Sequence, residues 1–512
     1  MANKTDLKAY LKYDGSGKMI PGSLILSRSK PKVGDWSEID AYKCCNGPAP
    51  TICSNFWINQ TVNSESADTL YALGSAIDSN CNSFMLMVDY WLSPNNPNQN
   101  SYVNSLLQKF NDAGELVWSR TFDFAENGTS LYIETETIAI DKEDNPICFF
   151  TVYGGELDIL TTTAITKFDN DGNELWSIVL DRSVYSANIE YVESVAFDAA
   201  NNMYVSFLIQ PLGGIGNNIV IVRKISPAGV VLASKTVTFI DNVFSPLINV
   251  NSAGEVYLVC TTPDTDKSYI VKLDSSLIEI WNKSFSAGNL SGAYGIAFDK
   301  DENIVLQIGN GANQSYYSNP LYGAYIKMSP EGNVIWTTKI SNINTIYGNE
   351  YVLGTFQLNS DGDGNIYISS YLPNTPIPGY TLTYSSSPLI IAKLLSNGSF
   401  EWAYIIESPN DIAGYFWGSP IVGNLVNNSL VLAFYDNTDP YNAQLFKLPL
   451  TPVADGVYGS YKFTDITNLW TTSSPTPTFI DSVANYYDVP TTVIPITYLT
   501  FEGTYTTINT PL

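Results

Sequence analysis

The sequence predicts an all-β protein, built as a ring of about seven similar four-stranded units. Three observations lead to this prediction. A polar turn that runs into a Trp recurs along the chain, as in "FDNDGNELWS" (168–177) and "MSPEGNVIWT" (328–337). Alternating or fully apolar segments around a second polar turn precede each copy, which is typical of short strands. Asn, Ser, Thr and Tyr are abundant, helix-forming stretches are scarce, and only 15% of the residues are charged.

The Trp residues of the motif define the repeat. They are Trp118, Trp176, Trp281, Trp336 and Trp402, and Ala233 occupies the equivalent place in the long gap. Four strands per unit at a spacing near 55 residues indicate the blades of a β-propeller. We expect each Trp to pack between neighbouring blades. The predicted units are 51–123, 124–182, 183–238, 239–287, 288–342, 343–408 and 409–465, of which the last lacks a Trp.

The chain divides into three regions. Residues 1–50 share no landmark with the repeats and form a small β module, with "YLKYDGSGKMIPGSLILS" as a hairpin around an Asp-Gly turn. Residues 51–465 form the propeller. Residues 466–512 form a Thr-, Pro- and Tyr-rich β tail, which either closes the ring onto the first blade or pairs with a neighbouring chain.

Composition excludes several functions. The chain has 50 acidic and 25 basic residues, so nucleic acid is not expected as a partner. Histidine is absent, which removes the common nucleophile-His pairs. No long apolar run predicts membrane insertion, and the N-terminus lacks the apolar region of a cleaved export signal. The sequence therefore predicts synthesis in a cytoplasm.

Neither a metal nor a cofactor is expected. Adjacent Cys44 and Cys45 cannot form the usual zinc-binding spacing, and Cys148 and Cys260 lie in apolar strands as buried thiols. A cytoplasmic origin makes disulfides unexpected. Among the acidic turns, Asp361 and Asp363 come nearest to a calcium loop, and the sequence leaves calcium binding there open.

The loops between the second and third strands of each unit vary in length and are rich in Tyr. Variable loops on one face of a regular scaffold are a common place for binding, and Tyr offers a large amphipathic contact surface. Packing of these side chains on one another or on a neighbouring subunit is the alternative. The candidate binding residues are Tyr90, Trp91, Tyr316, Tyr317, Tyr322, Tyr371, Tyr380, Tyr384, Tyr435 and Tyr441.

The first 45 residues or so carry the pattern YDGSGxxxPGSLxLxxxKPKxGxWxEI. This segment resembles a short N-terminal module in structural proteins of tailed phages that infect Bacteroidetes, including crAss-like phages. The resemblance implies a virion component held on the particle by its N-terminus, as a head or tail fibre or a similar appendage. The implied anchor residues are Tyr13, Asp14, Gly15, Pro21, Gly22, Lys30, Pro31 and Lys32. The propeller lies outside the resemblance.

The sequence thus predicts a non-enzymatic virion protein, made in the host cytoplasm and released by lysis. Its expected partners are other virion proteins at the N-terminal module, further copies of itself, and a host glycan or surface protein. Two alternatives remain. A propeller channel can gather the two carboxylates that glycoside hydrolysis needs, and a free lectin-like module would use the same Tyr-rich face.

Overall fold

The computed structural model contains two compact units, residues 1–52 and 53–512. In the first unit, the strands β1 (Lys8–Lys12), β2 (Ile25–Ser27) and β3 (Trp36–Ile39) form an antiparallel sheet in the order β2-β1-β3. The structure describes residues 8–12, 25–27, 36–39, 56–63, 69–92, 100–123, 125–126, 129–130, 132–153, 161–180, 188–211, 216–262, 267–286, 290–310, 323–343, 350–352, 358–371, 379–383, 388–408, 412–413, 422–426, 429–436, 442–473, 478–482, 484–488, 493–495, 499–501 and 505–511, some of them as backbone alone.

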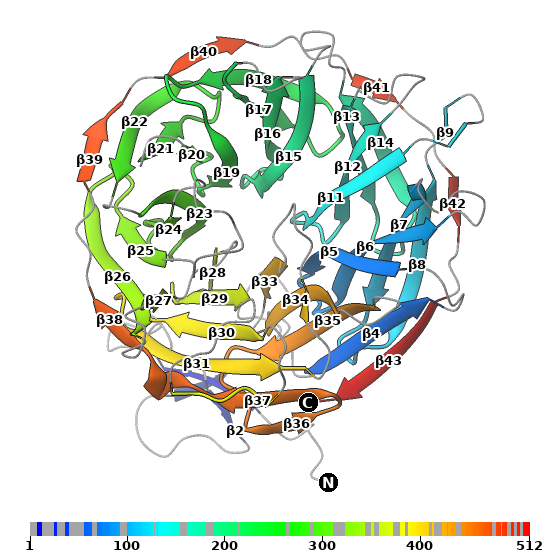
Figure 1. The fold of residues 1–512 in the computed structure, drawn as a ribbon, viewed down its shortest axis with the longest axis vertical. Coiled ribbons are helices and arrows are strands. Elements are labelled where there is room, and N and C mark those ends of the chain that lie inside the picture. Colours follow the sequence, from blue (N-terminus) through cyan, green and yellow to red (C-terminus); the bar gives the residue numbers. More distant parts are fainter. Residues whose placement is uncertain are drawn as a thin grey trace. The chain divides into compact units, whose positions relative to one another are not determined.

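The second unit is a seven-bladed β-propeller, as the sequence predicts (Figure 1). Each blade is an antiparallel sheet whose first strand lies nearest the centre of the ring. Blades 1 to 3 consist of β5 (Thr69–Ile77), β6 (Ser83–Leu92), β7 (Asn100–Phe110) and β8 (Leu116–Asp123); β11 (Tyr132–Ile140), β12 (Pro146–Tyr153), β13 (Thr161–Phe168) and β14 (Glu174–Leu180); and β15 (Asn188–Phe197), β16 (Met203–Pro211), β17 (Ile219–Ile225) and β18 (Val231–Thr238).

Blades 4 to 6 repeat the arrangement. They consist of β19 (Phe244–Val250), β20 (Val256–Thr262), β21 (Lys267–Leu273) and β22 (Glu279–Ser286); β23 (Leu290–Phe298), β24 (Ile304–Asn310), β25 (Gly323–Met328) and β26 (Val334–Ile343), with β27 (Glu350–Val352) beside β26; and β28 (Leu358–Ser360), β29 (Ile366–Tyr371), β30 (Leu389–Leu394) and β31 (Phe400–Glu407). A small hairpin of β9 (Ala125–Glu126) and β10 (Thr129–Ser130) follows blade 1.

Blade 7 takes its fourth strand from the other end of the chain. It consists of β33 (Val422–Val426), β34 (Ser429–Asp436), β35 (Asn442–Pro449) and β4 (Trp57–Asn63), with β32 (Ile412–Ala413) beside β34. The strand β4 pairs antiparallel with β35, so a strand that precedes blade 1 in sequence closes the ring. The expectation that the C-terminal tail closes the ring onto the first blade is therefore wrong.

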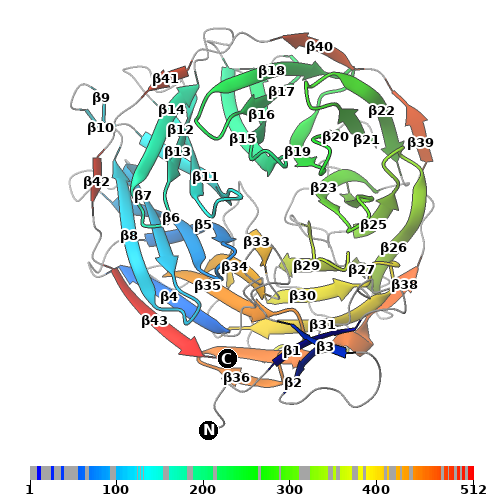
Figure 2. The same ribbon diagram turned by 180° about the vertical axis from the view of Figure 1, so that it is seen from behind.

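The C-terminal tail instead runs around the outside of the ring and adds a strand to every blade (Figures 1 and 2). We call residues 456–511 the belt. It passes the blades in the order 6, 5, 4, 3, 2, 1 and 7, opposite to their order in the sequence. Its strands are β36 (Gly456–Tyr458), β37 (Tyr461–Asp465), β38 (Thr471–Ser473), β39 (Thr478–Asp481), β40 (Asn485–Asp488), β41 (Val493–Pro495), β42 (Leu499–Phe501) and β43 (Tyr505–Pro511), with a 3₁₀ turn at Thr467–Leu469.

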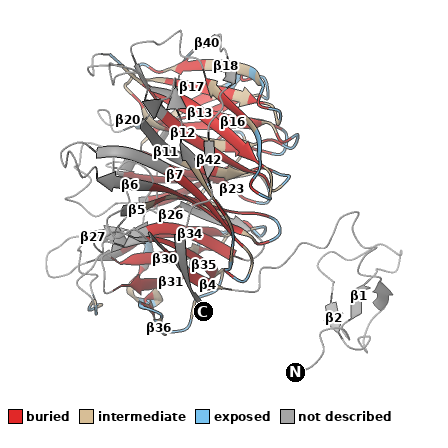
Figure 3. Cartoon of the chain, turned by 90° about the vertical axis from the view of Figure 1, so that its right-hand side faces the viewer, coloured by how far each residue is buried: buried red, intermediate tan, exposed pale blue. Residues whose placement is uncertain are grey.

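The buried side chains form one apolar cluster at each of the seven interfaces between blades. Successive residues of a strand point to opposite faces of the sheet, so each blade contributes to the cluster on either side of it. Figure 3 shows these buried strands in red and the exposed turns in pale blue along one edge of the ring. The apolar core of the propeller therefore lies between the blades.

Candidate functional site

The repeated polar turns share one hydrogen-bonding scheme, which the turn at Asp169 illustrates. The Asp169 N–H donates to the Asn173 carbonyl at 2.8 Å, and the Gly172 N–H donates to the Asp169 carbonyl at 3.1 Å. The Asp169 Oδ1 accepts from the N–H groups of Asp171 and Asn173. Gly172 has φ of +81°, a conformation that glycine adopts without strain. In this turn Asp supplies the side-chain acceptor and Gly supplies the positive φ.

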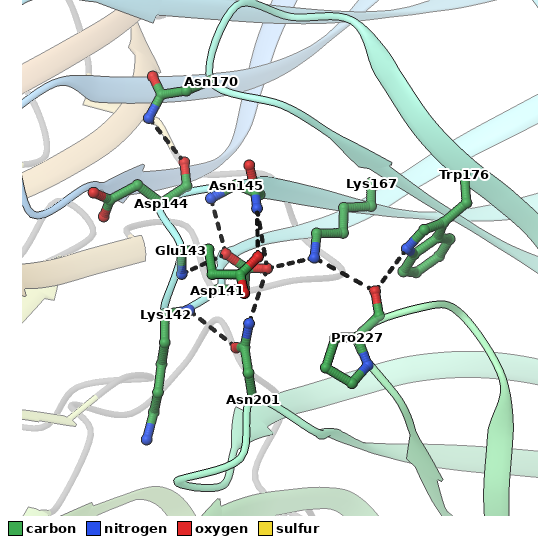
Figure 4. Close-up of polar contacts among 10 residues, drawn as sticks. All are labelled: Asp141, Lys142, Glu143, Asp144, Asn145, Lys167, Asn170, Trp176, Asn201 and Pro227. Atoms are coloured by element: carbon green, nitrogen blue, oxygen red, sulfur yellow. Dashed lines mark hydrogen bonds and ion pairs between the residues drawn. The ribbon is translucent and has the colours of Figure 1, made fainter.

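The clearest polar constellation of the propeller lies between blades 2 and 3 (Figure 4). Lys167 Nζ contacts Asp141 Oδ2 at 2.6 Å and donates to the Pro227 carbonyl at 3.5 Å. Trp176 Nε1 donates to the same carbonyl at 2.9 Å. Lys167 and Trp176 are paired across neighbouring strands, so two side chains of blade 2 converge on one carbonyl of the blade 3 turn. We call this arrangement the Lys-Trp clamp.

Burial and hydrogen bonding have opposite effects on the pKa of the Asp141 carboxyl in this clamp. Burial alone raises the pKa of Asp141, but the hydrogen bonds from Lys167 and from the Asn145 and Glu143 N–H groups outweigh it, and the pKa lies below its usual range. The carboxylate therefore remains charged over the ordinary pH range. The Asn201 amide of blade 3 donates to Asp141 Oδ2 at 3.2 Å and joins the two blades a second time.

The clamp recurs at three other interfaces. In each, a Lys and a Trp of one blade donate to a single turn carbonyl of the next blade. A glycine of that turn faces the Trp ring or, at one interface, the chain of a second Lys, Lys283. The sets are Lys109 and Trp118 on Asn170, Lys272 and Trp281 on Pro330, and Lys327 and Trp336 on Ser396, facing Gly172, Gly332 and Gly398. A side chain at these glycines would overlap its neighbour, which explains why Gly and Trp occur together in the repeat.

Blade 7 has a Trp that sequence reasoning missed. Trp57 on β4 pairs with Lys447, and its Nε1 donates to the Asp112 carbonyl of blade 1 at 3.1 Å. Lys447 Nζ is fully buried and contacts the Asp112 carboxylate. The signal for this residue existed, because "NFWIN" resembles the other Trp strands. It went unrecognised because it precedes the first repeat instead of following the seventh.

The interface between blades 3 and 4 replaces Trp and Gly by other residues. Ala233 stands where the Trp would be, and Leu277 with φ of +65° stands where the turn glycine would be. Leu277 is buried in the cluster that also contacts Ala233. At this interface the larger side chain therefore belongs to blade 4 and the smaller one to blade 3. The Tyr204 hydroxyl and Lys224 Nζ donate to the Ser275 carbonyl at 3.3 and 3.1 Å, in place of the Trp and its Lys.

Trp402 is the most buried of the five motif Trp residues, at 7% exposed. It stacks on Tyr404 at 5.4 Å between ring centroids and lies within the cluster of blades 6 and 7. The connection after β35 continues into the belt instead of returning as a blade strand, so Trp402 packs without a clamp carbonyl among the contacts of the described residues.

The turn at Asp361 and Asp363 uses its carboxylate internally. Asp361 Oδ1 accepts from the Asp363 and Asn365 N–H groups, and Oδ2 accepts from the Asn365 amide and the Tyr367 hydroxyl at 2.9 and 3.0 Å. In the part of the chain that the structure describes, His, Cys, Asp and Glu do not gather in a group able to hold a metal ion. The sequence of this turn is accounted for by its hydrogen bonds.

Among the candidate binding residues, Tyr380 has a described side chain. Its hydroxyl donates to Glu407 Oε1 at 2.5 Å and contacts Thr464 Oγ1 at 3.1 Å. Lys462 of the belt lies 3.4 Å from the same Glu407 oxygen, and the Thr383 N–H donates to Oε2. Glu407 is fully buried. Tyr380 therefore fastens the variable loop of blade 6 to the belt.

The other candidates of this face are not assembled into a site by the described residues. Tyr90, Trp91, Tyr371 and Tyr435 lie at strand ends, with their backbone alone described. Tyr316, Tyr317, Tyr322, Tyr384 and Tyr441 lie outside the described residues. The anchor residues Tyr13, Asp14, Gly15, Pro21, Gly22, Lys30, Pro31 and Lys32 also lie outside them.

Glutamates lie on two of the innermost strands, among them Glu190 and Glu193 on β15 and Glu136 on β11. Glu190 is buried and accepts from Arg223 Nη1 and Nη2 at 2.8 and 3.2 Å and from Thr163 Oγ1 at 3.1 Å. Glu193 sits at a β-bulge of β15, between Val192 and Ser194, and is half-buried. Burial raises the pKa of Glu193 to about 7. The corresponding bulge of the neighbouring inner strand β11 is at Glu136, described as backbone.

The cysteines differ in part from the expectation. Cys148 and Cys260 are free and fully buried, and burial raises the pKa of both thiols. Cys81 is disulfide-bonded, although the expected cytoplasmic origin had made disulfides improbable at assembly. Cys81 occupies the positive-φ position of its turn, with φ of +66°. Most cysteines of proteins made in the cytoplasm stay reduced, but this tendency does not determine the redox state of any one cysteine pair.

Comparison with known proteins gives no family for this chain. No protein-family model matches the chain, and no curated protein matches it. A protein of unknown function from Dyadobacter fermentans is 10% identical, with a TM-score of 0.40 over 77% of this chain and 98% of its own. An α-L-arabinanase of Penicillium chrysogenum is 12% identical, with a TM-score of 0.37 over 65% and 98%. An α-L-arabinofuranosidase of Fusarium graminearum is 8% identical, with a TM-score of 0.36 over 78% and 99%.

Among the described residues, no helix is long and apolar enough to cross a membrane.

Proposed function

We propose that the protein is a non-enzymatic structural component of a phage virion. In this proposal the N-terminal unit attaches the chain to the particle, and the propeller is presented to neighbouring subunits or to a glycan or protein of the host surface. The observation that carries the proposal is the division of the chain into a small separate β unit and a ring closed by β4 and surrounded by the belt. The resemblance of the first 45 residues or so to phage modules indicates that the N-terminus is the attached end.

The use of polar groups in the ring supports a frame rather than a reaction centre. The buried Lys, Asp and Glu side chains of the clamps donate to or accept from the next blade, as Lys167 and Asp141 do. The Tyr380 cluster fastens a loop to the belt in the same way. Groups already saturated by structural hydrogen bonds hold blades together and leave the variable loops as the surface for recognition.

Deletion of residues 1–52 tests the attachment. Particles assembled in cells that produce the full chain should retain it through a density gradient, whereas particles made with residues 53–512 should lack it. Circular dichroism and thermal melting of the purified 53–512 chain control for folding. Equal incorporation of a folded 53–512 chain would contradict N-terminal attachment.

A carbohydrate-active enzyme is the second candidate, and Glu193 is the specific observation in its favour. A carboxyl with a pKa of about 7 is suited to act as a general acid near neutral pH. Glycoside hydrolysis needs a second carboxylate. Glu136, at the equivalent bulge of the adjacent inner strand, is the residue we propose for it. Release of reducing sugar from a polysaccharide panel, lost in Glu193→Gln, would establish this function over the structural one.

A further inference from the structure

A repeated apolar surface lies on the outer side of five consecutive blades. Of the eleven large apolar side chains that are exposed among the described residues, eight lie at the start of a fourth strand or directly before it. We call these eight the apolar band. They are Val117, Leu175, Val230, Leu232, Ile278, Ile280, Val334 and Ile335, each between 42% and 59% exposed.

The band follows from the geometry of the clamp. Val117, Leu175, Ile280 and Ile335 each directly precede the Trp of their blade. Neighbouring residues of a strand point to opposite faces, so the Trp turns toward the next blade while its neighbour turns away from it. Scattered exposed aliphatic residues need no explanation, but the same position exposed on blades 1 to 5 is a regular surface.

The band has definite ends. On blade 6, the place before Trp402 is taken by Glu401, which forms an ion pair with Lys393 at 2.8 Å. On blade 7, the belt strand β43 pairs with β4 over its full length from Trp57 to Asn63. On blades 1 to 5 the described belt pairs lie further along the fourth strand, as at Thr121–Asp123 of β8. In blades 1 to 5, the first residues of the fourth strand therefore have no described pair with the belt.

The charge beside the band is negative. Glu115, Asp171, Glu174, Glu279 and Glu331 are exposed next to it. The nearby cations are used within the ring: Arg120 Nε donates to the Gly172 carbonyl at 3.0 Å, and Lys283 pairs with Asp481 of the belt at 3.2 Å. A partner for this surface should therefore be basic and carry apolar side chains.

We propose that the apolar band binds a second copy of this chain, through the basic N-terminal segment of that copy. Residues 1–43 contain 8 Lys or Arg against 5 Asp or Glu, whereas the rest of the chain contains 17 against 45. The N-terminal segment is thus the part of the protein with the charge opposite to that of the band. Two rings meeting band to band would bring like charges together, so a head-to-tail contact is favoured over a symmetric one.

Sedimentation velocity of the full chain over a range of concentrations tests this contact. The wild-type chain should self-associate in low salt and dissociate as salt screens the charges. The double variant Leu175→Ser, Ile280→Ser should weaken the association at least about tenfold, because it removes two exposed apolar contacts without a change of charge. The matched control Ile240→Ser, Val457→Ser removes exposed apolar side chains outside the band and should leave it unchanged.

Charge reversal identifies the partner segment. Lys30→Glu with Lys32→Glu, or Glu174→Lys with Glu279→Lys, should each weaken self-association, and the two sets combined should restore it. A wild-type chain that stays monomeric up to about 100 µM in low salt would overturn the proposal. So would association insensitive to the band variant, an equal loss in the control, or association insensitive to the N-terminal reversal. Because the purified chain is measured, these outcomes are independent of its incorporation into particles.

Discussion

At the scale of single residues, the interfaces between blades depend on matched sizes. At three interfaces a turn glycine lies against a Trp ring, and at a fourth it lies against the Lys283 chain beside Trp281. At the interface of blades 3 and 4, Ala233 and Leu277 share one apolar cluster instead. The Trp is also a hydrogen-bond donor, so its removal leaves a turn carbonyl with one donor fewer. Each interface therefore combines packing and a polar contact in a few side chains.

Replacement of Trp176 by Ala should lower the free energy of unfolding by roughly 3 kcal/mol, through the cavity and the lost hydrogen bond to Pro227. Chemical denaturation followed by circular dichroism measures this loss. Leu175→Ala is the matched control, because Leu175 is the next residue and is 51% exposed, and it should cost less than about 0.5 kcal/mol. Equal losses for the two variants would contradict the assignment of Trp176 to the interface.

At the interface of blades 3 and 4, a double-mutant cycle measures the coupling between the small Ala233 and the large Leu277. Ala233→Trp alone should destabilise by about 2 kcal/mol through overpacking against Leu277, and Leu277→Gly alone should destabilise by a similar amount through a cavity. Together they recreate a Trp-Gly pair, so their combined cost should fall at least about 1 kcal/mol below the sum. Additive costs would show that the two residues are not coupled.

Glu193 should make stability depend on pH in a direction opposite to that of most carboxylates. Its pKa is raised from 4.5 to about 7, so the native state holds a proton that the unfolded state has lost between these values. Stability from this group is complete below about pH 4.5 and is lost as the pH rises through 7.

Glu193→Gln should therefore match the wild type at pH 4.5 and exceed it by about 2 kcal/mol at pH 8, a value reduced for partial exposure. Urea melts at both pH values measure the difference. Glu174→Gln, at an exposed position, is the control and should show no such change. A difference between wild type and Glu193→Gln that is the same at both pH values would contradict the raised pKa.

At the scale of elements, the belt covers outer strand edges that would otherwise be open to pairing with other chains. A chain that ends at residue 470 should keep the buried anchors Phe463 and Trp470 but lose the belt from blades 5, 4, 3, 2, 1 and 7. We expect it to melt at lower temperature and to aggregate, as measured by calorimetry and light scattering. A truncated chain as stable and soluble as the full one would show that the belt does not contribute.

The elements also show how far the sequence leads. Four strands per repeat and the Asx-Gly turns were predictable, because each turn satisfies its own hydrogen bonds and each Trp repeats at a fixed offset. The closing strand β4 was missed because its Trp57 precedes the first repeat instead of following the seventh. The belt was missed because short polar strands pair through their backbone and leave little pattern in the side chains. The site was predicted least well: Tyr380 fastens a loop, and the raised pKa of Glu193 depends on burial by residues distant in the sequence.

At the scale of the whole molecule, the ring combines two independent constraints. The N-terminal strand β4 completes blade 7, and the belt passes every blade, so both ends of the propeller chain lie on its outer side (Figure 1). Opening the ring requires separation of an interface cluster and of the belt across it. Such a frame suits a protein that carries mechanical load or holds variable loops in fixed positions, which is the role proposed for it on a particle.

Quantitative mass spectrometry of gradient-purified virions from cultures that produce the protein, before and after a wash in high salt, tests this role most directly. The account predicts that the chain is present in fixed proportion to known particle proteins and remains after the wash. Absence of the chain from the particles, or its complete removal by salt, would contradict a structural role in the virion.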